Sequence, residues 1–238
     1  MGNSLQQNEA WFEARRGKFT GSNFKNLIGE GKAIIYNKDK ECYLYKKVTK
    51  VVRKKDVDYL VPLFTDTGFN YIRKVVAERM GSYEIQSHSK ACEWGSTYEA
   101  EAIEVYEERT GYTVEETGFI VHAKYDFTGC STDGNIIGEK GIIEVKNPYN
   151  PANYIRYATD EAYILKEHGS QIYGNMWVSE ASYCDFIAYD RRNTTMPIYI
   201  NRFHRDEEKI SQIEERVLLA EQVAQAMYND IVNPNLEF

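Results

Sequence analysis

The sequence lacks the features that mark several large classes of protein. No apolar run approaches the roughly 20 residues that a membrane-spanning helix needs, and the polar N-terminal segment lacks the apolar core of a signal peptide. The cysteines form no C-x-x-C pair, which argues against a zinc ribbon, and a long chain without a secretion signal rarely has a disulfide framework. They are Cys42, Cys92, Cys130 and Cys184. We therefore expect a cytoplasmic protein with buried or half-buried thiols and no membrane partner.

Proline is scarce, with five residues, and no stretch rich in proline, glycine and serine divides the chain, so we expect one domain over residues 1–238. Hydrophobic residues make up 42% and charged residues 27% of the sequence, as in a folded globular protein. The net charge of −7 argues weakly against non-specific binding of nucleic acid, although local charge decides such binding. The basic segment from Lys38 to Lys55 is either a phosphate-facing surface or the solvated face of a helix.

Apolar spacing predicts helices toward both ends of the chain, with strands between them. The expected longer helices cover residues 39–54, 66–80, 93–109, 160–177 and 206–228, and the expected strands cover residues 112–122, 127–131, 135–137, 142–145, 183–189 and 197–203. Gly17 is expected to end a short first helix, and Thr20 or Ser22 to cap a second. This order of elements predicts a mixed α/β (α+β) fold, in which helices flank a central mixed β-sheet.

Two carboxylates and a lysine carry the strongest chemical signal. Asp133 stands before a strand that a tight turn joins to the segment from Ile142 to Lys146. Side chains alternate along a strand, so Glu144 and Lys146 share a face, and the hairpin can bring Asp133 beside them. Two close carboxylates suit Mg²⁺, and the lysine can hold a water or stabilise charge on a phosphate. The alternative is an ordinary Asp-Gly turn before a strand with a solvated face, but the flanking apolar residues indicate a central strand.

A third carboxylate is expected on the helix over residues 93–109. Glu99 follows Tyr98, one turn after Gly95 and Ser96, whose small side chains would let another segment approach closely. The other glutamates of this helix fit a solvated face better. We therefore place Glu99 with the two strand carboxylates.

Four blocks of residues, in this order along the chain, resemble the phage lambda exonuclease family of viral-type alkaline recombination exonucleases. They are Ala10-Trp11…Arg15-Arg16-Gly17…Thr20-Gly21-Ser22, then Trp94-Gly95…Tyr98-Glu99, then Cys130-Ser131-Thr132-Asp133-Gly134 with Glu144-Val145-Lys146-Asn147-Pro148, and finally Gln171…Met176-Trp177. The third block resembles the family's PD-(D/E)xK core. The family usually has proline at the place of Thr132 and cysteine at the place of Asn147, and residues 32–89 do not align with it convincingly.

The resemblance implies a restriction-endonuclease-like core and Mg²⁺-dependent 5′-to-3′ digestion of one strand of linear double-stranded DNA, for phage-type homologous recombination or DNA end processing. It implies two Mg²⁺ ions, for which Mn²⁺ can substitute. The metal ligands that it implies are Asp133, Glu144, Glu99 and the carbonyl of Val145, with Lys146 as catalytic lysine and Gln171 near the attacking water. Arg15, Ser22 and Ser131 match the family's pocket for a terminal 5′-phosphate, where a guanidinium forks onto phosphate oxygens and hydroxyls donate to the rest.

The resemblance also implies partners, namely the ends of double-stranded DNA, a single-strand annealing protein and further copies of the chain in a ring-shaped homotrimer. If a phage encodes the chain, they meet in the cytoplasm of the host cell. Two alternatives stay open. One is another PD-(D/E)xK nuclease, Cas4-like or structure-selective, although the lone Cys184 does not fit a Cas4-like cysteine pair. The other is a catalytically dead DNA-binding recombination module, against which the intact trio Asp133, Glu144 and Lys146 argues.

Overall fold

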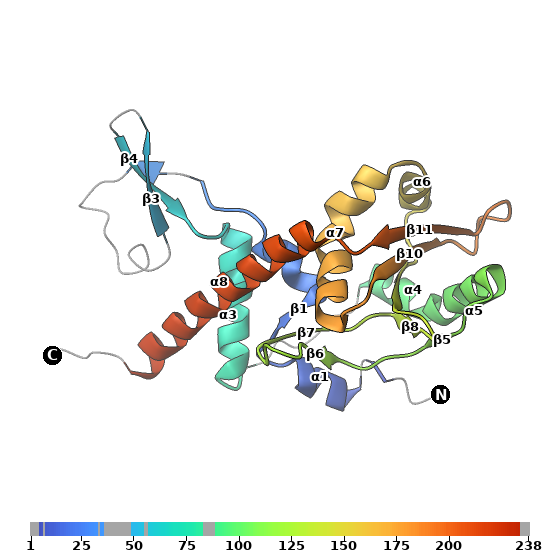
Figure 1. Ribbon diagram of the computed structural model, residues 1–238, viewed down its shortest axis with the longest axis horizontal. Helices are drawn as coiled ribbons and strands as arrows, with labels where there is room; N and C mark the ends of the chain where they lie inside the picture. The colour runs from blue at the N-terminus through green and yellow to red at the C-terminus, as the bar shows by residue number, and fades with distance from the viewer. Residues whose placement is uncertain are drawn as a thin grey trace.

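The structure, a computed structural model, describes residues 5–6, 8–32, 34–35, 49–54, 57–82 and 89–233. Figure 1 shows the course of the chain. The helices are α1 (Glu9–Arg15), the 3₁₀ helix η1 (Gly21–Leu27), α3 (Asp66–Arg79), α4 (Lys90–Thr97), α5 (Glu99–Thr110), α6 (Pro151–Thr159), α7 (Glu161–Ser179) and α8 (Glu207–Val232). The strands are β1 (Phe19–Thr20), β2 (Ile34–Ile35), β3 (Thr49–Lys54), β4 (Val57–Pro62), β5 (Val114–Glu115), β6 (Ile120–Val121), β7 (Thr128–Cys130), β8 (Gly134–Ile136), β9 (Gly141–Lys146), β10 (Tyr183–Tyr189) and β11 (Ile198–His204).

The central sheet has five strands in the order β11–β10–β9–β8–β5. Strands β9 and β10 run parallel, whereas the other neighbouring pairs are antiparallel, so the sheet is mixed, as the sequence predicts. Gly138, with a φ of 80°, allows the tight turn between β8 and β9. All residues of β9 from Gly141 to Val145 are buried, which confirms the central position expected from their apolar character.

Alternation along β9 divides its side chains between the two faces of the sheet. Ile143 and Val145 belong to an apolar cluster with residues of α5. Ile142 belongs to the larger cluster, which includes residues of α6 and α7, and Glu144 and Lys146 follow it at two-residue spacing. Figure 1 shows α6 above this sheet and α5 below it. The prediction of a central sheet flanked by helices is therefore confirmed.

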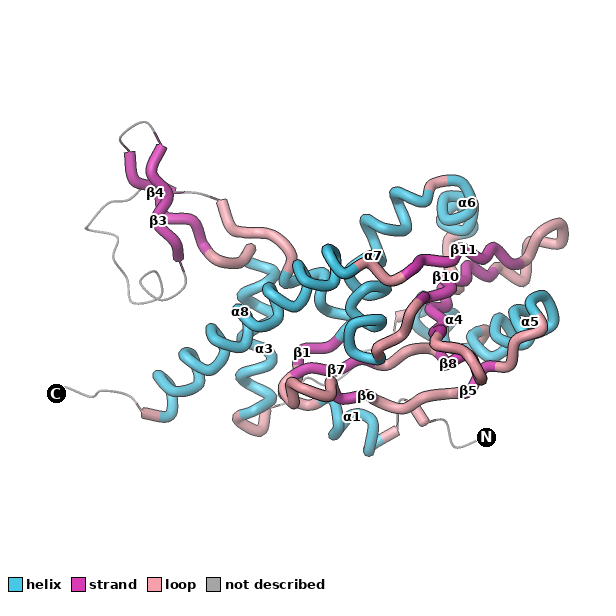
Figure 2. The backbone as a smooth tube through the Cα atoms, in the orientation of Figure 1, coloured by secondary structure: helices cyan, strands magenta, loops and turns pink. Residues whose placement is uncertain are grey.

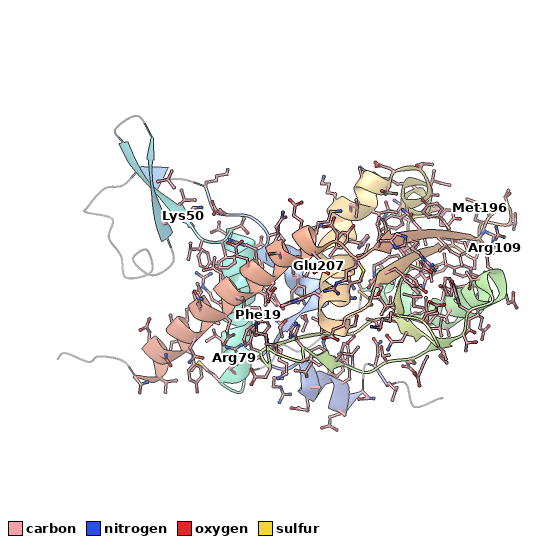
Figure 3. The ribbon with its side chains drawn as sticks, in the orientation of Figure 1. Phe19, Lys50, Arg79, Arg109, Met196 and Glu207 are labelled. Atoms are coloured by element: carbon pink, nitrogen blue, oxygen red, sulfur yellow. The ribbon has the colours of Figure 1, made fainter. Side chains whose placement is uncertain are left out.

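A second sheet, β1–β7–β6, joins the N-terminal segment to the middle of the chain. Strand β1 runs parallel to β7 with Phe19 opposite Thr128, and both residues are fully buried. The ring of Phe19 packs edge-on against Tyr71 of α3, with centroids 5.6 Å apart, and Arg79 lies beside the same ring (Figure 3). This pairing fixes α1 and η1 next to β7, which Ser131 follows directly.

The third sheet, β2–β4–β3, is antiparallel and lies apart from the central sheet, at the upper left of Figure 2. The predicted helix over residues 39–54 is wrong at residues 49–54, because these form β3 and pair with β4. Residues 39–48 lie outside the described residues. Within the basic segment, the side chain of Lys50 forms an ion pair with Glu30. The interpretation as a solvated helix face is wrong for residues 49–54, which are a strand, and the interpretation as a phosphate-facing surface stays a prediction.

Two further predictions need correction. The helix expected over residues 93–109 is two helices, α4 and α5, which meet at Tyr98. The strand expected over residues 112–122 contains only β5 and β6, which belong to different sheets. Helix α6, which begins at Pro151, is not among the helices predicted from the sequence. Within the described ranges, no helix is both long and apolar enough to span a bilayer.

Candidate active site

Asp133 lies immediately before β8 and faces β9. Its Oδ2 accepts a hydrogen bond from the amide of Val145 at 2.6 Å, and its own amide donates to the carbonyl of Ile143 at 3.3 Å. These bonds extend the pairing of β8 with β9 by one residue and place the carboxylate beside Glu144. The hairpin therefore brings the two acids together, as the sequence predicts.

Glu144 is 0% exposed and has two partners. Lys146 forms an ion pair with its Oε1, and Asn175 of α7 donates from Nδ2 to its Oε2 at 3.2 Å. The ammonium of Lys146 also donates to the carbonyl of Val145 at 3.2 Å. Because the lysine side chain is 27% exposed, the group opens to solvent on the lysine side.

We call Asp133, Glu144 and Lys146 the carboxylate–lysine group, and burial has the largest effect on the pKa values of its two acids. Burial raises the pKa of Glu144 to about 8, while Lys146 opposes the rise and Asp133 adds to it. Burial also raises the pKa of Asp133, again against the effect of Lys146. Burial alone would lower the pKa of Lys146, but the two carboxylates raise it above its usual value, so the lysine stays an ammonium ion. One ammonium thus offsets two crowded acids.

Glu99 is the first residue of α5 and supplies a third carboxylate. The pKa of Glu99 is raised to about 7, first by burial and then by the charge of Asp133, while Lys146 opposes the rise. Gln171 is half-buried on α7, and within the described part of the chain no hydrogen bond joins it to the carboxylates. The structure thus brings together Asp133, Glu144 and Lys146, lets Glu99 act on them through its charge, and places Gln171 on the helix that bears Asn175.

The chemistry of these donors fits a hard divalent cation. Two carboxylates and the carbonyl of Val145 supply oxygens of the kind that Mg²⁺ prefers. Burial raises the pKa of both acids because it disfavours their charged form, and a divalent cation beside them would stabilise that charged form. Among the described residues, no three Asp, Glu, His or Cys side chains already stand in metal-holding geometry. The cation against Glu144 is instead the ammonium of Lys146.

A second polar group, the arginine pocket, consists of Arg15, Ser22 and Ser131. Arg15 donates from Nη1 to Oγ of Ser131 at 3.2 Å and from Nη2 to Oγ of Ser22 at 3.4 Å. Trp11 donates from Nε1 to the same oxygen of Ser131 at 2.8 Å, and its ring lies 4.0 Å from the guanidinium carbon. The parallel pairing of β1 with β7 brings these distant segments together. Since Ser131 is two residues before Asp133, the pocket adjoins the carboxylates.

Sequence reasoning misses two residues of this site. Trp11 stands four residues before Arg15, so a helical period puts both on one face of α1. Asn175 stands four residues after Gln171, and the same period puts both on one face of α7. These spacings are visible in the sequence, but they do not say what each side chain touches.

Two residues that depart from the family's pattern have structural contacts. Thr132 is 0% exposed, and its hydroxyl lies 2.8 Å from that of Thr117. Asn147 donates from its side chain to the carbonyl of Gly95 in α4 at 2.9 Å. Both side chains therefore tie neighbouring segments to the β8–β9 hairpin.

Known proteins resemble the chain over most of its length. The family model described as the YqaJ-like viral recombinase domain matches residues 10–182. The crystal structure of LHK-Exo, an alkaline exonuclease from Laribacter hongkongensis, has a TM-score of 0.72 at 24% identity, covering 94% of this chain and 96% of that chain. LHK-Exo in complex with dAMP has a TM-score of 0.70 at 26% identity, covering 96% and 100%.

A phage-related exonuclease from Haemophilus somnus 129PT has a TM-score of 0.65 at 20% identity, covering 90% of this chain and 96% of that chain. No curated protein sequence matches the chain. The structural likenesses confirm the predicted restriction-endonuclease-like fold.

Proposed function

The chain belongs to the family of YqaJ-like viral recombinase domains, and on that premise we propose that it uses Mg²⁺ to degrade one strand of linear double-stranded DNA from the 5′ end. The family and the solved alkaline exonucleases support the enzyme class, an exodeoxyribonuclease that acts in recombination. The metal and the direction of digestion rest on the site itself.

One observation carries the proposal: the arginine pocket adjoins the carboxylate–lysine group through the two-residue step from Ser131 to Asp133. The pocket presents a guanidinium and two hydroxyls, which suit a phosphate at the end of a strand. The neighbouring acids and ammonium suit hydrolysis of the adjacent phosphodiester. A site that binds a terminal 5′-phosphate and hydrolyses the next phosphodiester along the strand would remove nucleotides from the 5′ end.

The side chains of the site have different proposed roles, which follow from their charge and polarity. Mg²⁺ bound at the acids would supply a Lewis acid for the attacking and leaving oxygens of an in-line displacement. Lys146, an ammonium ion, donates hydrogen bonds to the attacking water or to a phosphate oxygen and offsets its charge. Gln171 orients the water from α7. The residues that would hold two ions are Asp133, Glu144, Glu99 and, through its carbonyl, Val145.

The decisive experiment digests linear duplex DNA labelled at either the 5′ or the 3′ end, with Mg²⁺ or with EDTA. We expect the 5′ label to leave first, no digestion in EDTA, and no digestion by Asp133→Asn. Asp126→Asn is the matched control, because this exposed acid lies in the same part of the chain and outside the site. Undiminished digestion by Asp133→Asn would refute the proposal. Release of the 3′ label before the 5′ label would show digestion from the 3′ end and refute the proposed direction.

The same assay separates the alternatives. Cutting of a nicked circle or a branched duplex in preference to linear ends would favour a structure-selective nuclease, whereas Mg²⁺ binding without digestion would favour a dead DNA-binding module. We also propose a ring-shaped homotrimer on duplex DNA, a single-strand annealing protein as partner, and the host-cell cytoplasm as the place of action. Sedimentation of the purified protein tests the trimer.

A further inference from the structure

The carboxylate of Glu144 depends on an uncommon buried amide. Asn175 is 0% exposed and lies near the C-terminal end of α7, where its Nδ2 donates to Oε2 of Glu144 at 3.2 Å. Its Oδ1 is buried and has no hydrogen-bond partner among the described residues. A buried amide with an unmet acceptor is unfavourable for folding, so a purely structural role would be met better by an apolar side chain.

The place of the amide is set by its other neighbour, Gly21. A Cβ on Gly21 would lie 2.2 Å from Oδ1 of Asn175 and 3.2 Å from Cβ of Cys130. The contact continues one residue earlier on α7, where a Cβ on Gly174 would lie 2.3 Å from the ring of Phe24. The 3₁₀ helix η1 therefore packs close against α7 because both meeting points are glycines, and this packing confines the amide from the side away from Glu144.

We infer that Asn175 is a positioning residue, which orients the Glu144 carboxylate for a divalent cation, and that Gly21 is the backbone position that keeps the amide in place. Lys146 contacts Oε1 and Asn175 contacts Oε2, so the amide fixes the rotation of the carboxylate about its last bond. The inference rests on the proposed function, since it takes Glu144 as a metal ligand. It also joins the two halves of the site, because Gly21 directly precedes Ser22 of the arginine pocket.

The test is a calorimetric titration of the metal-free full chain with Mg²⁺ in the absence of DNA. Asn175→Leu keeps the approximate shape of the side chain and removes the donor. Partners of metal ligands typically change metal affinity about 10–100-fold, and we expect a loss of that order. Ser179→Ala is the matched control, because its hydroxyl donates to the backbone carbonyl of Asn175 at 2.7 Å and not to the side chain, so Mg²⁺ affinity should stay unchanged.

A second pair of variants decides the matter if Asn175→Leu does not fold. Gly21→Ala places a methyl group against Oδ1 of Asn175, so we expect it to weaken Mg²⁺ binding in the natural sequence. In an Asn175→Ala background the obstructing oxygen is gone, and Gly21→Ala should have little further effect. Equal effects of Gly21→Ala in both backgrounds, or unchanged affinity in Asn175→Leu, would overturn the inference.

The proposed function can fail separately. If the natural protein binds Mg²⁺ but leaves duplex DNA intact, the nuclease proposal is wrong, while the affinities of the variants still decide the role of Asn175. If the natural protein digests DNA and Asn175→Leu binds Mg²⁺ as tightly as it does, the positioning role alone is wrong.

Discussion

Replacing Arg15 by alanine should weaken the recognition of a 5′-phosphate far more than it weakens the fold. The guanidinium is aimed by two serine hydroxyls, at 3.2 and 3.4 Å, and by the ring of Trp11 at 4.0 Å. A hydrogen bond to a charged group contributes about 1.5–3 kcal/mol, and 1.4 kcal/mol corresponds to a factor of ten. We therefore expect digestion of 5′-phosphorylated duplex to slow by roughly 10- to 150-fold at low substrate concentration.

The assay compares initial rates on two duplexes that differ only in a 5′-phosphate or a 5′-hydroxyl. For the natural protein the phosphorylated end should be preferred, and Arg15→Ala should remove most of that preference. Arg16→Ala is the matched control, since it deletes the same charge from the next residue, which forms an ion pair with Glu13 at 2.7 Å. An equal loss on both duplexes would refute the assignment of the pocket, because the lost contact would then not involve the phosphate.

Two predictions concern stability. Asp185 is 1% exposed and accepts hydrogen bonds from Arg202 at 2.7 Å and from the hydroxyl of Tyr106 at 2.6 Å. Arg202→Met should lower the free energy of unfolding by about 3 kcal/mol, the low end for a broken buried pair because the arginine is partly exposed. Tyr106→Phe should cost about 1.5 kcal/mol, the low end for a hydrogen bond to a charged group, because Arg202 still pairs with the carboxylate. Equal losses for the two variants in urea unfolding would contradict this. His168, which contacts the hydroxyl of Tyr157 at 2.9 Å, has its pKa lowered to about 3, first by burial and then by Lys146. The unfolded chain therefore binds a proton near pH 6.5 that the fold rejects, so stability is full above that pH and falls as pH drops toward 3, by at most about 1.4 kcal/mol per pH unit. Urea unfolding at pH 7 and pH 5 should show a smaller loss in His168→Gln than in the natural protein, and identical losses would show that the histidine is not the cause.

Local patterns predicted the parts of the fold whose signals are complete within a short window. The helix α3 runs from Asp66 to Arg79 and is capped by Thr65, whose hydroxyl accepts from the amide of Gly68. The β8–β9 hairpin follows from Gly138 between two apolar runs, and it brings Asp133 to Glu144 without help from distant segments. Helix α3 and the β8–β9 hairpin can therefore be predicted from the local spacing of apolar residues and from the glycine of the turn.

The errors come from contacts between distant segments. The apolar stripe of the helix expected over residues 93–109 continues across Tyr98, so periodicity alone cannot show that α4 and α5 meet there. Residues 49–54 fit a helical spacing, but pairing with β4 makes them a strand. Asn175 belongs to the site because α7 packs against η1 and the Asn175 side chain reaches Glu144 of β9, which no short stretch of sequence records.

The separation of the arginine pocket along the chain has a consequence for any shortened form of the protein. Arg15 and Ser131 lie 116 residues apart, and the parallel pairing of β1 with β7, two residues long, is what brings them into register. Closing so long a loop costs conformational entropy that must be recovered by packing elsewhere. A fragment that carries only one side of this pairing therefore cannot assemble the contacts of Arg15 with Ser131.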